Sequence, residues 1–385
     1  MSYTQDLLRF GVSLLIFWLV VFLLSKILPL KNYGVEVKPA YVTFKSSRFK
    51  ALLYRISEKR RFFWRILSNL SIVFGVGLTI YAIYFLLDNL LKLVEPGAEG
   101  APVLPVLPGL TIRLYWLPYL LLAVSSGVIA HEAAHGVIAR IENISLKSAG
   151  LAFVLAFPAG FVEPDEGEFE DSPTLSKLRV VSVGSFVNLV MFLIVLFIMS
   201  ALFVDAPAGI VVTEVMEGSP IQLAGVQPWD VVYDINGTLR DMGYNASGAL
   251  QNLTRFIASV IPGETLELTT SRGVRWMVVR NSTKEKPLGV LSYWIYYPSK
   301  AVFGPLFDVH LWFALLWGEI VYSSLAILNM LPLFPFDGEK FVFYMIERFA
   351  KERSKEIRIV LSAVFLGIIA GNMILSFIKY GPFLF

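Results

Sequence analysis

The chain has 385 residues, of which 56% are hydrophobic and only 16% are charged, and its mean hydropathy is +0.66. This is more apolar surface than one soluble core buries, so a lipid bilayer must supply part of the solvent. The formal net charge of +3 is too small to indicate nucleic acid as a partner. Because the chain has no cysteine, disulfides and thiolate metal ligands are excluded, and a metal site would have to use His, Asp and Glu.

Six apolar stretches have the length and the low charge of transmembrane helices. They run over residues 7–30, 66–92, 114–139, 178–204, 309–331 and 358–379. The first is long and lacks a small-residue cleavage site, so we interpret it as a retained helix and not as a signal peptide. The sequence therefore predicts an α-helical, polytopic integral membrane protein with about six transmembrane helices.

The distribution of positive charge predicts the side on which each loop lies. Residues 31–65 carry ten Lys or Arg against two acidic residues, which marks this loop as cytoplasmic. Six spans then place residues 93–113 and 205–308 outside, and residues 140–177 and 340–358 inside. The last of these stretches is itself rich in Lys and Arg, in agreement with this orientation.

The third apolar stretch contains His131-Glu132-Ala133-Ala134-His135 near its predicted cytoplasmic end. On a helix, two imidazoles four residues apart project from one face and can share a zinc ion, with the adjacent Glu as general base. Such a polar cluster in hydrocarbon is costly unless its members are paired or metal-bound. We therefore predict one Zn²⁺ per chain at His131 and His135, with Glu132 as the catalytic base. The alternative is a cluster that only hydrogen-bonds neighbouring helices.

A catalytic zinc takes a third protein ligand and leaves its fourth position to water, and Asp337 is the candidate. It follows Pro332 and Pro335, which end the fifth span at the same predicted membrane depth as the two His. Gly338 would let the backbone approach the metal closely. Without the paired His, an Asp-Gly after two prolines would be interpreted as a turn at the membrane interface.

H-E-A-A-H at 131–135 and N-M-L-P-L-F-P-F-D-G at 329–338 together resemble the site-2 protease family of intramembrane zinc metalloproteases. The resemblance covers most of the chain from about residue 114 to 340. It implies zinc bound by the two His and Asp337, catalysis by Glu132, and cleavage of transmembrane protein substrates in regulated intramembrane proteolysis. Gly184-Ser185-Phe186-Val187-Asn188 is similar to the family's G-x-x-x-N, whose Asn is expected to face the active site.

Two asparagines near these motifs have two interpretations each. Asn188 would donate a hydrogen bond to the developing oxyanion, or it would bond across helices that pack through Gly184 and Ser185. Asn329 would line the substrate path, or it would orient the loop that carries Asp337.

Residues 206–300 have a soluble composition, with short β-branched runs separated by Gly, Asn and Pro. This pattern predicts a β-rich module outside the membrane, and it resembles the PDZ domains that many site-2 proteases carry at this place. A PDZ groove binds a peptide C-terminus as an added strand, here through the backbone near Gly209 and Ile210. The alternative is a steric lid whose groove binds nothing.

Residues 146–172 combine an apolar run with Pro158 and Gly160 and then an acidic stretch. In the resembled family this region forms a small membrane-associated β-hairpin, whose exposed strand would hold an unwound substrate beside the zinc. We interpret the acidic stretch as a solvated loop. Within it, Glu163 is an alternative third zinc ligand, since some zinc proteases use a downstream Glu.

The predicted organisation has five parts and places the active site nearer the cytoplasmic side. They are two N-terminal transmembrane helices (1–113), the first half of the catalytic core (114–205), the PDZ-like domain (206–300), the second half of the core (301–340) and a C-terminal transmembrane helix (341–385). Two alternatives to an intramembrane protease stay open. One is a zinc protease that cuts chains at the cytoplasmic face, and the other is a catalytically inactive scaffold that binds exported C-termini.

Overall fold

The structure is a computed structural model that describes residues 3–155, 157–279, 288–301, 303–347 and 353–381. The chain forms two compact units. The first consists of Met1–Leu193 with Trp317–Phe385, and the second of Ile194–Leu316.

Six helices among the described residues are long and apolar enough to cross a membrane, which confirms the predicted number of spans. They are α1 (Tyr3–Ile27), α3 (Arg61–Val94), α4 (Leu117–Ile141), α6 (Thr174–Leu202), α9 (Pro305–Leu328) and α11 (Ser354–Tyr380). Their exposed faces are crowded with Leu, Ile, Val and Phe, as expected for helices whose solvent is lipid.

The predicted hairpin is present as β3 (Leu146–Val154) and β4 (Phe157–Pro164), and it is part of a larger sheet. Two strands in the basic loop, β1 (Val35–Lys38) and β2 (Tyr41–Lys45), extend it to the antiparallel order β1-β2-β3-β4. The following helix is α2 (Ser47–Glu58). Ser46 caps its N-terminus, since the Ser46 side chain accepts a hydrogen bond from a backbone N–H of the first turn. The basic loop is thus structured, which the charge count alone did not predict.

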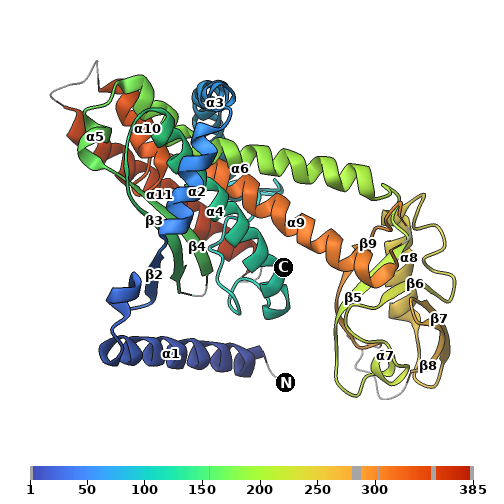
Figure 1. The fold of residues 1–385 in the computed structure, drawn as a ribbon. Helices are drawn as coiled ribbons and strands as arrows, with labels where there is room; N and C mark the ends of the chain where they lie inside the picture. Colours follow the sequence, from blue (N-terminus) through green and yellow to red (C-terminus); the bar gives the residue numbers. More distant parts are fainter. Residues whose placement is uncertain (1–2, 156, 280–287, 302, 348–352, 382–385) are drawn as a thin grey trace. The chain divides into compact units, whose positions relative to one another are not determined.

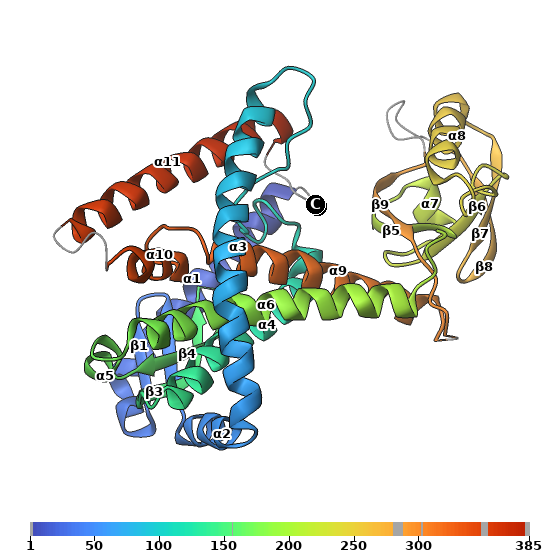
Figure 2. The ribbon, with the colours of Figure 1, turned by 90° about the horizontal axis from the view of Figure 1, so that it is seen from above.

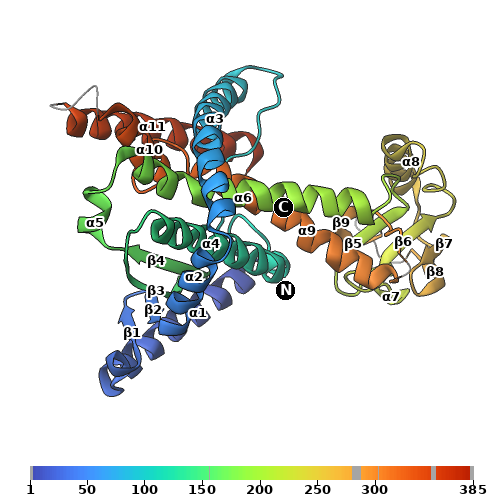
Figure 3. The ribbon, with the colours of Figure 1, turned by 45° about the horizontal axis from the view of Figure 1, so that its top comes forward.

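The sheet lies against the helix that carries the two His, as Figure 3 shows for β4 beside α4. Two glycines allow this close approach. A Cβ at Gly160 would lie 3.1 Å from the backbone of Ile129, and one at Gly136 would lie 3.1 Å from the side chain of Val162. Larger residues would push β4 away from α4.

Small and polar side chains join the remaining helices of the first unit. Where α3 crosses α6, the hydroxyls of Ser71 and Ser182 lie 2.8 Å apart, and both residues are fully buried. Figure 2 shows one end of α11 meeting α3, and there the Asn89 side-chain amide donates to the Asn372 Oδ1 atom at 2.9 Å. The Asn372 amide in turn donates to the Leu86 carbonyl at 3.0 Å, so this buried pair is well satisfied.

The second unit carries a β-rich module, as predicted, with a five-stranded antiparallel sheet of order β8-β7-β6-β5-β9 (Figure 1). Its elements are β5 (Gly209–Val215), α7 (Pro220–Leu223), β6 (Val231–Ile235), α8 (Ala246–Ser259), β7 (Thr265–Thr270), β8 (Gly273–Val278) and β9 (Val290–Tyr296). Alternate residues such as Ile210, Val212, Leu266 and Leu268 form its core.

The prediction that an added strand binds at Gly209 and Ile210 is wrong in this sheet. Both residues lie on β5, which pairs with β9 along its length and with β6 at Ile210 and Val211. The backbone groups that an added strand would need are therefore already bonded. The open edges of the sheet belong to β8 and β9.

We expect Asn372→Leu to lower the stability of the helical unit by about 1 kcal/mol, because it removes three hydrogen bonds between and within α3 and α11. Thermal unfolding in detergent would show this as a lower Tm. The control is Ile374→Leu, at an exposed position of the same helix. Equal unfolding temperatures for the two variants would contradict the assignment.

Candidate functional site

The two distant motifs meet, as predicted. The Asp337 Oδ2 atom lies 2.9 Å from His131 Nε2 and 3.2 Å from His135 Nε2. Within the described part of the chain, these three residues form the group whose ligand atoms, all within 4.8 Å of one another, could hold a metal ion. Donors bound to one tetrahedral zinc at ordinary bond lengths lie about 3.3 Å apart, so the set of two imidazoles and one carboxylate fits that ion.

Asp337 is the first residue of a helix, α10 (Asp337–Ile346), and does not lie in the turn that an Asp-Gly pair suggests. A carboxylate is favourable in the first turn of a helix, where backbone N–H groups are unpaired. The role predicted for Gly338 needs correction. A Cβ here would lie 2.2 Å from the backbone of Met330, and the Gly338 N–H donates to the Asn329 carbonyl at 2.7 Å. The glycine thus lets α10 pack on the preceding loop and not on a metal.

One face of α6 holds the far side of both imidazoles. His135 Nδ1 lies 2.6 Å from the Val180 carbonyl oxygen, to which an Nδ1–H would donate, and His131 Nδ1 lies 3.1 Å from the Asn188 amide. Residues 180, 184 and 188 are spaced by four and lie on one face of the helix. With both Nδ1 atoms engaged by α6, both Nε2 atoms are directed toward Asp337.

Asn188 is fully buried, and when its Nδ2 faces the ring its Oδ1 has no hydrogen-bond partner in the described part of the chain. Turning the amide by 180° makes Oδ1 the acceptor of a hydrogen bond from His131 Nδ1–H. That arrangement satisfies the orphaned oxygen and leaves a lone pair on Nε2, which a metal ligand requires. The contact favours the interhelical interpretation of Asn188 over donation to an oxyanion.

Gly184 makes room for the two rings. A Cβ at this position would lie 2.6 Å from His131 Cε1, His131 Nε2 and His135 Nε2. Because the rings belong to a buried site, they cannot move aside without leaving Asp337. Glycine is therefore the residue that lets α6 approach α4 at the depth of the imidazoles.

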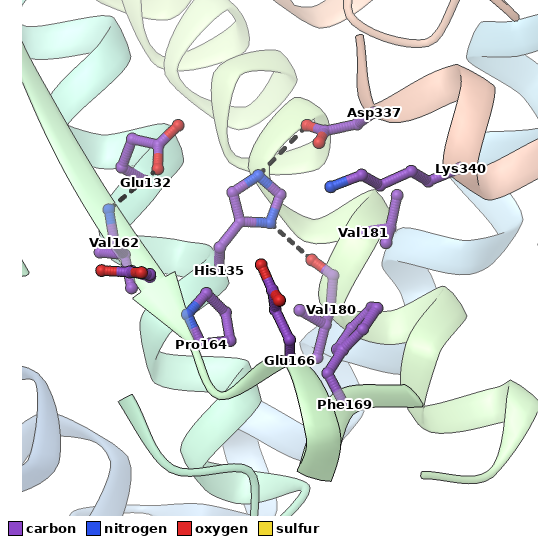
Figure 4. A pocket seen from close by; sticks show the side chains of 11 residues that line it. Glu132, His135, Val162, Pro164, Glu166, Phe169, Val180, Val181, Asp337 and Lys340 are labelled. Atoms are coloured by element: carbon purple, nitrogen blue, oxygen red, sulfur yellow. Dashed lines mark hydrogen bonds and ion pairs between the residues drawn. The ribbon is translucent and has the colours of Figure 1, made fainter. Parts of the chain in front are cut away.

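Glu132 lies on the sheet side of the site. Its Oε2 accepts a hydrogen bond from the Val162 N–H of β4 at 3.2 Å. A cavity of about 310 Å³ is lined by Glu132, His135 and Asp337 (Figure 4), and a second one of about 250 Å³ is lined by His131, Glu132 and Asp337. Asn329 lines the second cavity. The general-base candidate thus faces space on two sides of the metal-binding group.

The Asp337 carboxyl is held in its ionised form. Burial alone would raise its pKa, but a charged His135 and hydrogen bonds from both imidazoles, in the form that carries a proton on Nε2, lower it below its usual range. A metal ion would take the place of these Nε2 protons. Asp337 is therefore ionised at neutral pH and can serve as a ligand.

Glu163 is not part of the group. Its carboxylate is exposed and accepts a hydrogen bond from the Ser148 hydroxyl at 2.6 Å across the β3–β4 hairpin. The acidic stretch that follows contains a short helix, α5 (Glu166–Glu170), capped by the Asp165 side chain. The geometry does not favour Glu163 as third ligand.

Sequence reasoning missed two contributors to the site. One is the Val180 carbonyl, a backbone group that every residue has, so the sequence does not single it out. Lys340 lines the larger cavity from α10, and its spacing of three from Asp337 would have indicated it if a helix had been predicted there.

Comparison with known proteins agrees with these motifs. The model of a family described as "Peptidase family M50" matches residues 119–371. An uncharacterized protein of Methanocaldococcus jannaschii is 25% identical over 329 residues, which cover 84% of this chain and 81% of that protein. A membrane-bound transcription factor site-2 protease homolog of Arabidopsis thaliana is 22% identical over 214 residues, which cover 54% of this chain and 42% of that protein.

We expect Gly184→Ala to abolish tight zinc binding, because its methyl group overlaps both imidazoles. Asn188→Ala should weaken zinc binding about 10- to 100-fold through loss of the ring's hydrogen bond, and Asn188→Asp should retain most of the affinity. Zinc competition with a chromophoric chelator measures both effects. Ser185→Ala is the matched control, since the buried Ser185 hydroxyl has no hydrogen-bond partner among the residues that the structure describes. Unchanged affinity in Gly184→Ala and Asn188→Ala would refute the role given to α6.

Proposed function

Because the chain belongs to peptidase family M50, we propose that it is a zinc-dependent membrane protease that cuts other membrane proteins within or beside their transmembrane segments. One observation carries the proposal. His131 and His135 from one membrane helix and Asp337 from a second motif bring three metal-ligand atoms together next to Glu132. This is the arrangement that metal-assisted amide hydrolysis requires.

The reaction would proceed by addition of water to the scissile carbonyl carbon. The two His and Asp337 would hold the zinc ion, which would supply Lewis acidity toward the carbonyl and the attacking water. Glu132 takes the proton from water and passes it to the leaving amine as the C–N bond breaks. The hydrogen bond that Glu132 accepts from the Val162 N–H, at 3.2 Å, holds the carboxylate beside the cavity before substrate binds.

A substrate helix hides its carbonyls in its own hydrogen bonds and must unwind before it is cut. The edge strand β4 offers a place for the unwound segment, because it pairs with β3 on one side only and lies against Glu132. Asn329 would contact the substrate backbone from the second cavity. Substrates would therefore be cut as extended chains.

We infer that the β-rich module filters substrates outside the membrane. The segments that enter and leave the module meet, since the Val204 N–H donates to the Pro298 carbonyl at 3.0 Å and the Lys300 N–H to the Leu202 carbonyl at 2.7 Å. A module attached by two such closely spaced links can exclude bulky ectodomains. The basic loop at 31–65 supports the orientation in which this module lies on the extracytoplasmic side and the metal site nearer the cytoplasm. Regulated intramembrane proteolysis after a first cut suits such a filter.

We expect Glu132→Gln to keep one zinc per chain and to abolish cleavage, whereas Asp337→Ala should lose the metal. Glu163→Ala, the matched control for the third ligand, should keep both zinc and activity. Elemental analysis and cleavage of single-span proteins in vesicles measure the outcomes. Full activity in Glu132→Gln would overturn the proposal, as would zinc loss in Glu163→Ala with retention in Asp337→Ala. A wild-type chain with neither zinc nor activity would favour the inactive scaffold.

We expect replacement of residues 206–297 by a short Gly-Ser loop to relax the substrate requirement. Because the flanking links already lie within hydrogen-bond distance, the helices on either side can keep their places. Cleavage of single-span proteins with intact ectodomains should rise, and cleavage of those with truncated ectodomains should stay unchanged. Equal exclusion of large ectodomains by both chains would argue against a filter.

A further inference from the structure

Hydrolysis of an amide places negative charge on the carbonyl oxygen, and an enzyme gains most from a donor already aimed at that atom. The side chain of Asn188 is engaged with His131 at 3.1 Å and is therefore not available for this task. A donor for this oxygen would then come from the residues that line the cavities beside Glu132.

Lys340 meets this requirement by its place on α10. It follows Asp337 by three residues, so both side chains lie on the same face of the helix. Lys340 lines the larger cavity together with Glu132, His135 and Asp337, and Figure 4 shows its ammonium group directed toward the His135 ring and the Asp337 carboxylate.

The ammonium group has no competing partner within the described residues. Two other cations of this region are paired, Lys177 with Glu170 at 3.3 Å and Arg358 with Glu339. Lys340 forms neither an ion pair nor a hydrogen bond with any residue that the structure describes, although Glu163 and Glu166 also line the cavity. Its side chain is exposed, and its ammonium group is already directed toward the residues beside which a substrate carbonyl would lie.

We propose that Lys340 is a further catalytic residue of this site, which donates a hydrogen bond from its ammonium group to the oxygen of the scissile carbonyl. Water adds to the carbonyl carbon as Glu132 takes its proton, and the π electrons of the C=O bond move onto the oxygen. The lysine keeps its proton and stabilises the new charge. When the C–N bond breaks, the C=O bond reforms and Glu132 protonates the amine. This proposal rests on the proposed function.

The test compares Lys340→Met and Lys340→Arg with the wild type, in the full-length chain loaded with zinc. Removal of one preorganised donor lowers kcat by about 10²- to 10³-fold, and we expect Lys340→Met to do so with little change in KM. Lys340→Arg should recover part of the loss, because it restores a charged donor. The control is Lys38→Met, which removes an exposed positive charge from β1.

A second readout separates catalysis from structure. A phosphinic peptide carries a tetrahedral anionic centre, so its inhibition constant should rise in Lys340→Met in proportion to the loss in kcat/KM. Zinc content and unfolding temperature should stay at wild-type values. Activity of Lys340→Met within twofold of wild type would overturn the proposal, and so would an unchanged inhibition constant or loss of zinc. A wild-type chain that cleaves nothing would instead refute the proposed function.

Discussion

The site depends on the contact between one face of α6 and the two imidazoles of α4. The Val180 carbonyl and the Asn188 amide each hold a ring at Nδ1, at 2.6 and 3.1 Å. A ring fixed at Nδ1 presents its Nε2 in a defined direction, and a hydrogen bond accepted from Nδ1–H makes Nε2 a better ligand. The meeting with Asp337 follows, because both Nε2 atoms then converge on its carboxylate. H-E-x-x-H supplies the ligands, and α6 orients them.

This contact requires backbones to approach more closely than most side chains allow. Gly184 admits the rings, Gly338 admits the loop that precedes α10, and Gly160 brings β4 against α4. Buried small side chains likewise allow the surrounding helices to pack closely. Where α3 crosses α6, for example, the Ser71 and Ser182 hydroxyls lie 2.8 Å apart. In a bilayer, where apolar surface gives little drive for helix association, close packing and interhelical hydrogen bonds provide it. Glycine and serine therefore allow the close backbone approaches around the polar site.

Much of this could be predicted because the signals are local and strong. Each of the six apolar stretches, and the pair of His, can be recognised from a short segment of the sequence. The charge distribution of the loops then suggested that Asp337 lies at the same membrane depth as the two His. Other features depend on which β-strands pair with one another, and a short segment of sequence does not predict this. The strands at Val35–Lys38 and Tyr41–Lys45 are short, and they exist because β3 offers them an edge. The β-branched run that follows Gly209 correctly indicated a strand, but the sequence did not show which strands would pair with it. The hydrogen bond at the Val180 carbonyl involves the backbone, so the residue type at this position does not predict it.

The chain has only three His, so ¹⁵N spectra of histidine-labelled protein can test the arrangement of the rings directly. In the protein loaded with ¹¹³Cd as a substitute for zinc, two rings should show coupling of the metal to Nε2 together with a protonated Nδ1. The third ring, that of His310, should show neither change on metal loading. Coupling through Nδ1, or to fewer than two rings, would contradict the account, because α6 would then not orient the ligands.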